Sequence, residues 1–306
     1  MDIKNNLAII TITYNDDFKF QEWIKWYDEY KDSCYLHIIV DNGSALEYQE
    51  LVKKTFKDSV VLELGHNGGC TEAYNHGIKY ALRDENVQAI MLLGNDIQVK
   101  DGSLDAMFNF LQRNSEIGMV GGCVYRKGTN IIECYGDTIN CLGISKSNFR
   151  NGHIEDVPDI LEVSFVGGGA NMSSRRFYEV VGLQDENLFM YNDEMDMFYR
   201  AKRCGFKEAV IKEAQFWHQH ISPATSSIQY ACNMAFLNGR NRVYIIKKHM
   251  PLVKGLCMFI YMQILETIFF FRDIRDIKSR KAYFSKWRGF IAGLKGNMNN
   301  DFIKAL

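Results

Sequence analysis

Three carboxylates fall within four residues, at Asp193, Glu194 and Asp196. Carboxylates this close raise one another's pKa, which suits a general base that works near neutral pH. On a helix, Asp193 and Asp196 share a face while Glu194 points elsewhere. The other interpretation is that Asn192 caps a helix and that the acidic side chains complement its dipole. Spacing alone leaves both interpretations open.

Two further carboxylates each follow a short apolar run. Asp96 ends LLGND, where it could ligate a divalent cation bound to a diphosphate, or simply form a turn. Asp41 ends IIVD, where it could accept a hydrogen bond from a base N–H or a ribose hydroxyl, or form a turn with Asn-Gly. His218, beside Trp217, could ligate metal or bind phosphate, or be a partly buried structural residue.

A third polar segment has two glycines, Gly68 and Gly69, ahead of a predicted helix. Backbone N–H groups at such a helix start can face phosphate. The segment is not GxGxxG, so the sequence argues against a nicotinamide dehydrogenase.

Apolar runs alternate with helical periodicity in the first half of the chain. The predicted strands are Leu7–Thr13, Tyr35–Val40, Val60–Leu64 and Ala89–Leu93, and the predicted helices are Phe18–Tyr30, Ala45–Phe56 and Thr71–Leu82. This rhythm predicts an α/β fold with a Rossmann-like, mostly parallel sheet and flanking helices. Ligands bind such sheets at the carboxyl ends of the strands, where the polar clusters fall.

The second half is less regular. We predict strands at Ile117–Tyr125, Glu162–Val166 and Ala209–Lys212, and helices near Ser174–Val181, from Asn192 to Arg203, and over Tyr230–His249. We therefore expect a catalytic domain over residues 1–225 and a helical region over residues 226–306.

Composition narrows the classes of protein. A net charge of -1 over 306 residues argues against a nucleic-acid binder. The 8 cysteines are dispersed without CxxC, as in a reduced, cytoplasmic protein.

The C-terminal region changes character. Residues 251–271 are apolar but include Lys254, Gln263 and Glu266, so we do not expect a spanning helix. Residues 272–295 carry eight basic and two acidic side chains, a net charge of +6. We expect this region to lie on the anionic inner face of the membrane without crossing it. The alternative is that it packs on the catalytic domain or forms a homodimer contact.

Seven segments resemble, in order, the motifs of one family. They are TITYN (11–15), VDNGS (40–44), HNGG…AYNHGIKYA (66–81), LLGND (92–96), a block from GGGANM to CGF (167–206), WHQHISPATSS (217–227) and NGRNRVYIIKKH (238–249). The ordered set resembles a family 2 glycosyltransferase with a GT-A fold, of the bacterial rhamnosyltransferase-like branch.

The resemblance implies inverting transfer of a sugar from a UDP-, dTDP- or GDP-linked donor to a hydroxyl of a glycan or lipid-linked acceptor in cell-surface polysaccharide synthesis. It implies Mg²⁺ or Mn²⁺ as cofactor. The residues that it assigns to the donor are Tyr14, Asn15, Asp16, Asp41, Asn67, Gly69, Asn75 and Asn95. It assigns Asp96 and His218 to the metal, Gly168, Gly169 and Asp196 to the acceptor side, and Glu194 or Asp193 to the base.

Two positions depart from the family pattern. Gly94 replaces the first acid of a DxD motif, and Asp193-Glu194 replaces Glu-Asp. Because of these departures, one alternative stays open: the protein is a catalytically inactive, sugar-nucleotide-binding subunit of a polysaccharide assembly complex. A sugar-nucleotide pyrophosphorylase is disfavoured, because the loop after the first strand is acidic and has no glycine.

Overall fold

The computed structural model describes residues 2–141, 143–167, 169–219, 227–300 and 303. The chain forms two compact units. The first consists of Met1–Thr138, Ser145–Gln184 and Met197–His220, and the second of Ile139–Ile144, Asp185–Asp196 and Ile221–Leu306. The predicted domain boundary at residue 225 falls in 220–226, outside the described residues, and stays a prediction.

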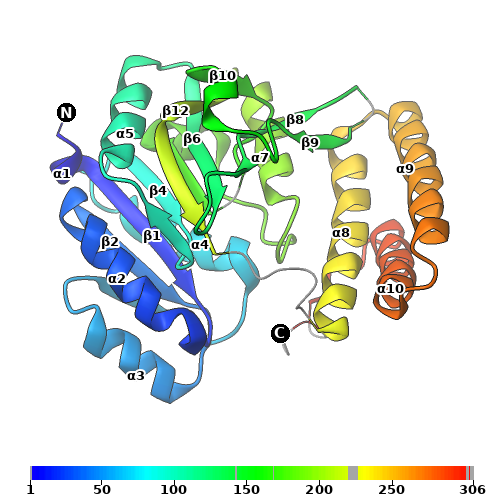
Figure 1. Ribbon diagram of the computed structural model, residues 1–306, viewed down its shortest axis with the longest axis horizontal. Helices are drawn as coiled ribbons and strands as arrows, with labels where there is room; N and C mark the ends of the chain where they lie inside the picture. Colours follow the sequence, from blue (N-terminus) through cyan, green and yellow to red (C-terminus); the bar gives the residue numbers. More distant parts are fainter. Residues whose placement is uncertain (1, 142, 168, 220–226, 301–302, 304–306) are drawn as a thin grey trace. The chain divides into compact units, whose positions relative to one another are not determined.

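A ten-stranded sheet forms the centre of the first unit (Figure 1). Its strands are β1 (Leu7–Thr13), β2 (Leu36–Asp41), β3 (Val60–Glu63), β4 (Ala89–Leu93), β5 (Ile97–Val99), β6 (Ile117–Arg126), β7 (Ile132–Cys134), β10 (Ile160–Val163), β11 (Ala170–Ser174) and β12 (Lys207–His218). The central order is β12-β6-β11-β4-β1-β2-β3, and of these only β11 runs against the others. The predicted α/β fold with a mostly parallel sheet is confirmed.

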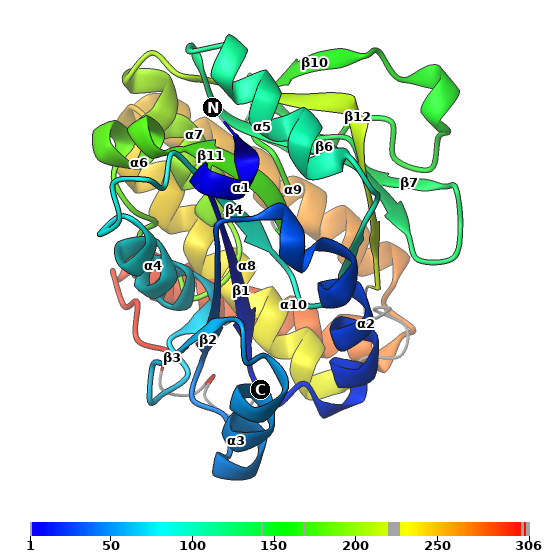
Figure 2. The ribbon, with the colours of Figure 1, turned by 90° about the vertical axis from the view of Figure 1, so that its left-hand side faces the viewer.

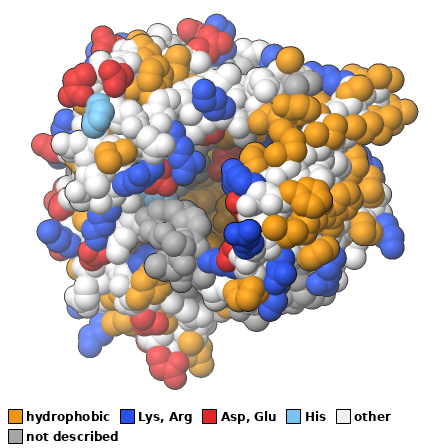
Figure 3. Space-filling view, turned by 45° about the vertical axis from the view of Figure 1, so that its right-hand side comes forward, with side chains coloured by type: hydrophobic (Ala, Val, Ile, Leu, Met, Phe, Trp, Pro, Cys, Tyr) orange, Lys and Arg blue, Asp and Glu red, His pale blue; other side chains and the backbone are white. Residues whose placement is uncertain are grey.

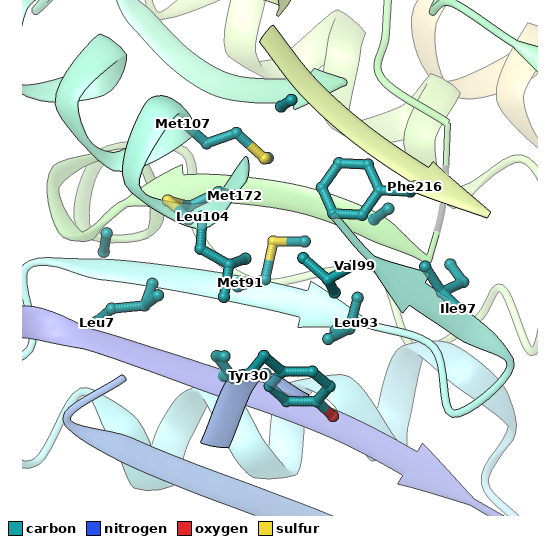
Figure 4. Packing of buried hydrophobic residues seen from close by; sticks show 14 of the residues in the cluster. Leu7, Tyr30, Met91, Leu93, Ile97, Val99, Leu104, Met107, Met172 and Phe216 are labelled. Atoms are coloured by element: carbon teal, nitrogen blue, oxygen red, sulfur yellow. The ribbon is translucent and has the colours of Figure 1, made fainter. Parts of the chain in front are cut away.

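Helices cover both faces of this sheet. They are α1 (Ile3–Asn6), α2 (Phe20–Tyr30), α3 (Leu46–Thr55), α4 (Gly69–Ala81), α5 (Ser103–Arg113), α6 (Arg175–Val181) and α7 (Asp193–Arg203). Figure 2 shows α2 and α4 on opposite sides of β1 and β2. The core on the α2 side also includes α5, whose Leu104 and Met107 meet Met91 and Phe216 of the sheet (Figure 4). A sheet covered on both faces explains why its strands are continuous apolar runs.

Several strands differ from the sequence prediction. We expected a strand at Ala209–Lys212 and an extended segment around His218, and β12 joins the two through a register shift between Ile211 and Gln215. β11 was not predicted, because its sequence, ANMSS, is polar although it pairs with β4 and β6 on both sides. β5 is also an addition, and it pairs with the end of β12 so that His218 stands opposite Ile97.

The second unit is helical, with α8 (Ile228–His249), α9 (Leu252–Arg272) and α10 (Ile277–Leu294). The α8 and α10 backbones approach closely at glycines. A Cβ at Gly289 would lie 2.1 Å from the Phe236 carbonyl oxygen, and a Cβ at Gly239 would lie 2.4 Å from that of Lys286. A hairpin of β8 (Asp137–Ile139) and β9 (Ser145–Ser147) completes the fold.

Candidate functional site

A hydrogen-bonded group lies where β1 and β4 end. These strands are parallel neighbours, so the residues that follow them meet at the same edge of the sheet. Asn95 donates from Nδ2 to Asp16 Oδ2 at 2.7 Å, and Thr13 Oγ1 lies 2.6 Å from the Tyr48 hydroxyl. The Tyr14 N–H also donates to Asp16 Oδ2, at 3.3 Å. The structure therefore brings together three of the predicted donor residues.

Asp96 lies at the same edge between two basic side chains. Its Oδ2 is 3.0 Å from Lys19 Nζ and 3.5 Å from His218 Nε2. The pairing of β5 with β12 positions His218, and the Gln219 N–H donates to the Asp96 carbonyl at 2.8 Å. The structure thus brings together the two predicted metal residues, with a lysine on the same carboxylate oxygen.

The charges of this group are fixed by its surroundings. Burial alone would raise the pKa of Asp96, but the hydrogen bond from His218 and the charge of Lys19 hold it at about 2. Burial would lower the pKa of His218, but hydrogen bonds to Asp96 and Glu133 raise it to about 9. Glu133 Oε2 is 3.4 Å from His218 Nδ1. At neutral pH the group therefore holds an aspartate and an imidazolium.

Sequence reasoning missed Lys19 and Glu133. Lys19 follows the predicted TITYN motif by only four residues, yet nothing local shows that its partner is 77 residues away. Glu133 belongs to a three-residue strand, β7, that has no apolar pattern to reveal it.

The residues present do not fit a preformed divalent-metal site. In the part of the chain that the structure describes, no group of three or more His, Cys, Asp or Glu side chains converges as a ligand set. Hard cations take six or more oxygen ligands, whereas the predicted pair offers one carboxylate and one imidazole. The Lys19 ammonium competes for that carboxylate.

One carboxylate oxygen of Asp41 accepts hydrogen bonds within the turn after β2, and the other accepts none from the described residues. Its Oδ1 accepts hydrogen bonds from the Gly43 and Ser44 N–H groups at 3.1 and 3.0 Å. Its Oδ2 is buried and has no hydrogen-bond partner among the described residues. Asn15, at φ 47°, fastens the neighbouring loop, because its N–H donates to Ser44 Oγ at 3.0 Å. Both sequence interpretations of Asp41, turn and donor contact, are compatible with this geometry.

The segment before α4 is held by amide side chains. Asn67 Oδ1 accepts from the Gly69 N–H at 3.1 Å and from Asn42 Nδ2 at 3.2 Å. Asn75 lies apart from this group. It is buried, and its amide exchanges two hydrogen bonds of 2.9 Å with the backbone of Gln184. In the structure, Asn75 therefore holds the backbone at Gln184, after α6, in place.

The glycines predicted for the acceptor side lie just before β11. The Gly169 carbonyl accepts from the Gly94 N–H at 2.7 Å, and Gly169 has φ 89°, a conformation that favours glycine. Gly168 lies outside the described residues.

The predicted base belongs to the second unit, in the first turn of α7. Asp193 is partly buried, and burial together with the charge of Asp196 raises its pKa, while a hydrogen bond with the Glu194 side chain opposes the rise. The turn before it is unusual, because Tyr191 and Asn192 both have positive φ, at 70° and 64°. A non-glycine residue with positive φ costs energy that surrounding contacts must offset.

α8 supplies those contacts. Asn241 donates from Nδ2 to the carbonyls of Met190 and Tyr191 at 2.9 and 3.0 Å. Asp196 is fully buried and pairs with His249 and Lys248, from the last turn of α8. The motif NGRNR therefore supports the acidic turn.

Arg240 in the same motif is also buried and donates to the Asn299 carbonyl at 3.0 Å. Its burial lowers its pKa to about 10. This arginine therefore packs inside the second unit and fastens the Asn299 backbone.

Two named proteins are similar in sequence. The low-salt glycan biosynthesis hexosyltransferase Agl10 of Haloferax volcanii is 23% identical over 202 residues, which cover 65% of this chain and 62% of that protein. The dTDP-rhamnosyl transferase RfbF of Shigella flexneri is 20% identical over 302 residues, which cover 96% of this chain and 98% of that protein. The chain thus spans less than two thirds of the first relative and nearly all of the second.

Two solved structures share the fold. GalNAc-T7, solved with UDP, GalNAc and Mn²⁺, superposes with a TM-score of 0.60 at 12% identity, over 79% of this chain and 47% of that one. TarS of S. aureus superposes with a TM-score of 0.51 at 13% identity, over 76% of this chain and 40% of that one. These likenesses confirm the expected GT-A fold.

The family itself follows from the sequence match. The model of glycosyl transferase family 2 matches residues 9–181, more than half of the chain. That range contains the Asp16, Asp41 and Asp96 segments on which the resemblance rested. This chain therefore belongs to glycosyltransferase family 2.

Proposed function

We propose that this protein transfers a sugar, with inversion at the anomeric carbon, from a nucleoside diphosphate sugar to a hydroxyl of a glycan or lipid-linked acceptor in cell-surface polysaccharide synthesis. The observation that carries the proposal is the polar edge of the sheet. There Asp16, Asn95 and Asp96 are fastened beside one another, and the buried Oδ2 of Asp41 remains open to a donor N–H or hydroxyl.

In this reaction the acceptor oxygen bonds to the anomeric carbon as the bond from that carbon to the diphosphate breaks. The acceptor proton passes to a carboxylate, and the electron pair leaves with the diphosphate. Glu194 is our candidate base, with Asp193 as the alternative. Burial and the charge of Asp196 raise the pKa of Asp193, which makes its carboxylate a stronger base.

The proposed donor is a dTDP-sugar, and the proposed sugar is rhamnose or another hexose. The relative that aligns with 96% of this chain is named a dTDP-rhamnosyl transferase. A UDP-sugar is the second candidate, because GalNAc-T7 was solved with UDP. A divalent cation is proposed only because it is the family's usual cofactor. Asp96 and His218 would be its ligands here, and the ion pairs that these two residues already make oppose its binding.

The test is transfer by the purified full-length chain. Thermal-shift screening against dTDP-, UDP- and GDP-sugars identifies the donor, since a ligand that binds the native state raises its apparent stability. Product formation from that donor with an inverted anomeric configuration, read by NMR, supports the proposal. A donor that binds but is neither transferred nor hydrolysed would favour the alternative of an inactive binding subunit.

We also propose that the protein works at the anionic inner face of the cytoplasmic membrane, through α9 and α10. Large apolar side chains recur along the ridge of α9 and are 50–87% exposed: Leu252, Leu256, Ile260, Ile264, Ile268 and Phe271. Exposed basic side chains follow at the end of α9, on the loop after it and on α10: Arg272, Arg275, Arg280, Lys281 and Arg288. Figure 3 shows hydrophobic side chains gathered over this helical region, with lysine and arginine beside them.

The geometry of α9 favours a helix that lies in the membrane surface. Its length and a mean hydropathy of 1.5 would allow it to cross a membrane, so composition alone does not exclude spanning, contrary to our expectation from its charges. However, Glu266 pairs with Lys286 of α10, and the ring of Phe270 stacks on Tyr283 at 4.3 Å. One side of α9 is thus packed on protein and the other is exposed, as in an interfacial helix.

A further inference from the structure

Among the residues that the structure describes, Lys19 is the one buried lysine. The residue is 8% exposed, and it ends a 3₁₀ turn, Asp17–Lys19, that leads into α2. Removing an ammonium group from water is costly unless carboxylates surround it. Its Nζ lies 3.0 Å from Asp96 Oδ2 and 3.9 Å from Asp16 Oδ1. The backbone fixes this position, because the Lys19 N–H donates to the Asp16 carbonyl at 3.0 Å.

Gly94 stands where a DxD motif has its first acid, so the loop Gly94–Asp96 carries a single carboxylate. A Cβ at Gly94 would lie 2.8 Å from Asp96 Oδ1, the end of a side chain that can rotate away. The one carboxylate of this loop faces the Lys19 ammonium group.

We infer that Lys19 is the resident cation of this site, and that its ammonium group supplies the positive charge that a divalent metal would otherwise supply. The inference rests on the proposed function. As the bond from the anomeric carbon to the diphosphate breaks, negative charge grows on the leaving phosphate oxygen. A preorganised cation at that edge stabilises this charge. The leaving diphosphate needs no proton, because it departs as an anion, and the Lys19 ammonium group meets its charge without a metal.

His218 lies on the same carboxylate oxygen as Lys19. Its Nε2 is 3.5 Å from Asp96 Oδ2, and its side chain is 22% exposed, so part of the ring reaches the surface of the group. Asp96 in this arrangement is a positioning residue: it holds Lys19 and His218 toward the donor side. The rival interpretation is that Lys19 is only a structural counter-ion, which a divalent cation displaces when the donor binds.

Binding of Mn²⁺ to the full-length protein tests this directly, without any need for turnover. We expect wild type to bind Mn²⁺ weakly when free Mn²⁺ is measured by electron paramagnetic resonance. Lys19→Met, which frees the Asp96 and Asp16 carboxylates, should bind it at least about tenfold more tightly, about 1.4 kcal/mol. Lys25→Met is the matched control, because Lys25 is exposed on α2, the helix that Lys19 precedes, and it should behave as wild type. Equal Mn²⁺ affinity in wild type and Lys19→Met would overturn the inference.

Turnover supplies the second measurement. Wild-type transfer should persist in EDTA, and Lys19→Met should lose on the order of 10²-fold in rate, as when one preorganised donor is removed. Lys19→Arg should retain part of the rate, because it keeps the charge. Wild-type transfer that EDTA abolishes and Mn²⁺ restores would overturn the inference while leaving the proposed function intact. Absence of transfer by every variant under all conditions would instead contradict the proposed function, with Mn²⁺ binding still deciding the role of Lys19.

Discussion

His249 and Asp196 join two helices of the second unit through a bond of 2.7 Å between Nε2 and Oδ1, and both side chains are fully buried. His249 is the last residue of α8, and Asp196 lies in the first turn of α7, beside the candidate base. Lys248 Nζ reaches the same oxygen at 2.8 Å. The end of one helix therefore fixes the acidic start of another, which the sequence predicted only as two separate motifs.

Replacing His249 by alanine should destabilise the protein and slow transfer. The change leaves a buried carboxylate with one partner fewer, at a cost of about 1–3 kcal/mol. Because the contact holds the start of α7, we expect the rate of transfer to fall while donor affinity stays unchanged. Urea unfolding, single-turnover rates and donor titration measure the three quantities.

His249→Gln keeps an N–H at similar reach and should recover part of the loss. His153→Ala is the control, since His153 is exposed and makes no side-chain cap. If His249→Ala lowers stability but not the rate of transfer, the contact between His249 and Asp196 contributes to folding alone.

Glu194→Gln should slow the chemical step more than Asp193→Asn does. A positioned general base contributes about 10²–10⁴-fold, and the amide removes the proton acceptor with little change in shape. Donor affinity should not change in either variant. Rapid-quench single turnovers with saturating donor separate the chemical step from binding.

Glu186→Gln, at an exposed position of the same unit, is the control. A larger effect of Asp193→Asn would exchange the two roles. If neither variant slows transfer by about tenfold, the acidic group is only a helix start.

Glu208 should make the stability of the first unit depend on pH. It is 2% exposed on β12, and its Oε2 accepts the Val166 N–H at 3.0 Å, while Oε1 has no partner in the described part of the chain. Burial raises its pKa to about 8. The unfolded chain ionises this group near pH 4.3, so the free energy of unfolding should fall as pH rises from about 4.3 to about 8.

Glu208→Gln should flatten this part of the pH profile. One pKa unit corresponds to about 1.4 kcal/mol, so the wild-type loss is on the order of a few kcal/mol across the interval. Melting temperatures at pH 5.5 and 8.5 measure the slope. Glu162→Gln, an exposed glutamate on the neighbouring strand β10, should keep the wild-type slope. A parallel pH profile for Glu208→Gln would show that Glu208 is ionised in the folded protein.

The strands that could be predicted are those whose sequence reflects burial on both faces. Leu7–Thr13 and Ala89–Leu93 are continuous apolar runs because helices cover both sides of them. β11 could not be predicted in this way, because its backbone pairs with two neighbours while three of its five side chains, Asn171, Ser173 and Ser174, are polar. Its place in the sheet depends on pairing between distant segments, which local periodicity does not encode.

The residues of the candidate site likewise include some that the sequence could predict and some that it could not. Asp41, Asp96 and the Asp193 group could be predicted because strand ends and helix starts are local features. Lys19 could not, because a lysine near an acidic loop is ordinarily solvated, and only the adjacency of β1 and β4 brings it to Asp96. The motif NGRNR was found, but its role in fastening the acidic turn required the fold of the second unit.

Membrane binding should depend on both the apolar ridge of α9 and the basic side chains of α10. Ile260→Asn together with Ile264→Asn removes two exposed apolar side chains, at 50% and 54% exposure, and should weaken sedimentation with anionic liposomes. Arg280→Gln together with Lys281→Gln should weaken it further. Each basic residue near an anionic surface is worth about 1 kcal/mol, and this part of the binding should fall as salt rises.

Leu46→Asn is the matched control, because Leu46 is 74% exposed on α3 of the first unit and should not affect lipid binding. Vesicles of phosphatidylcholine alone should leave the protein in the supernatant, and vesicles with added phosphatidylserine should sediment it. If the wild type stays in the supernatant with both and elutes as a dimer that the α9 substitutions dissociate, the ridge is a contact between copies of this chain. If only detergent extracts the protein from membranes, and high salt does not release it, α9 crosses the bilayer and the surface-bound arrangement is wrong.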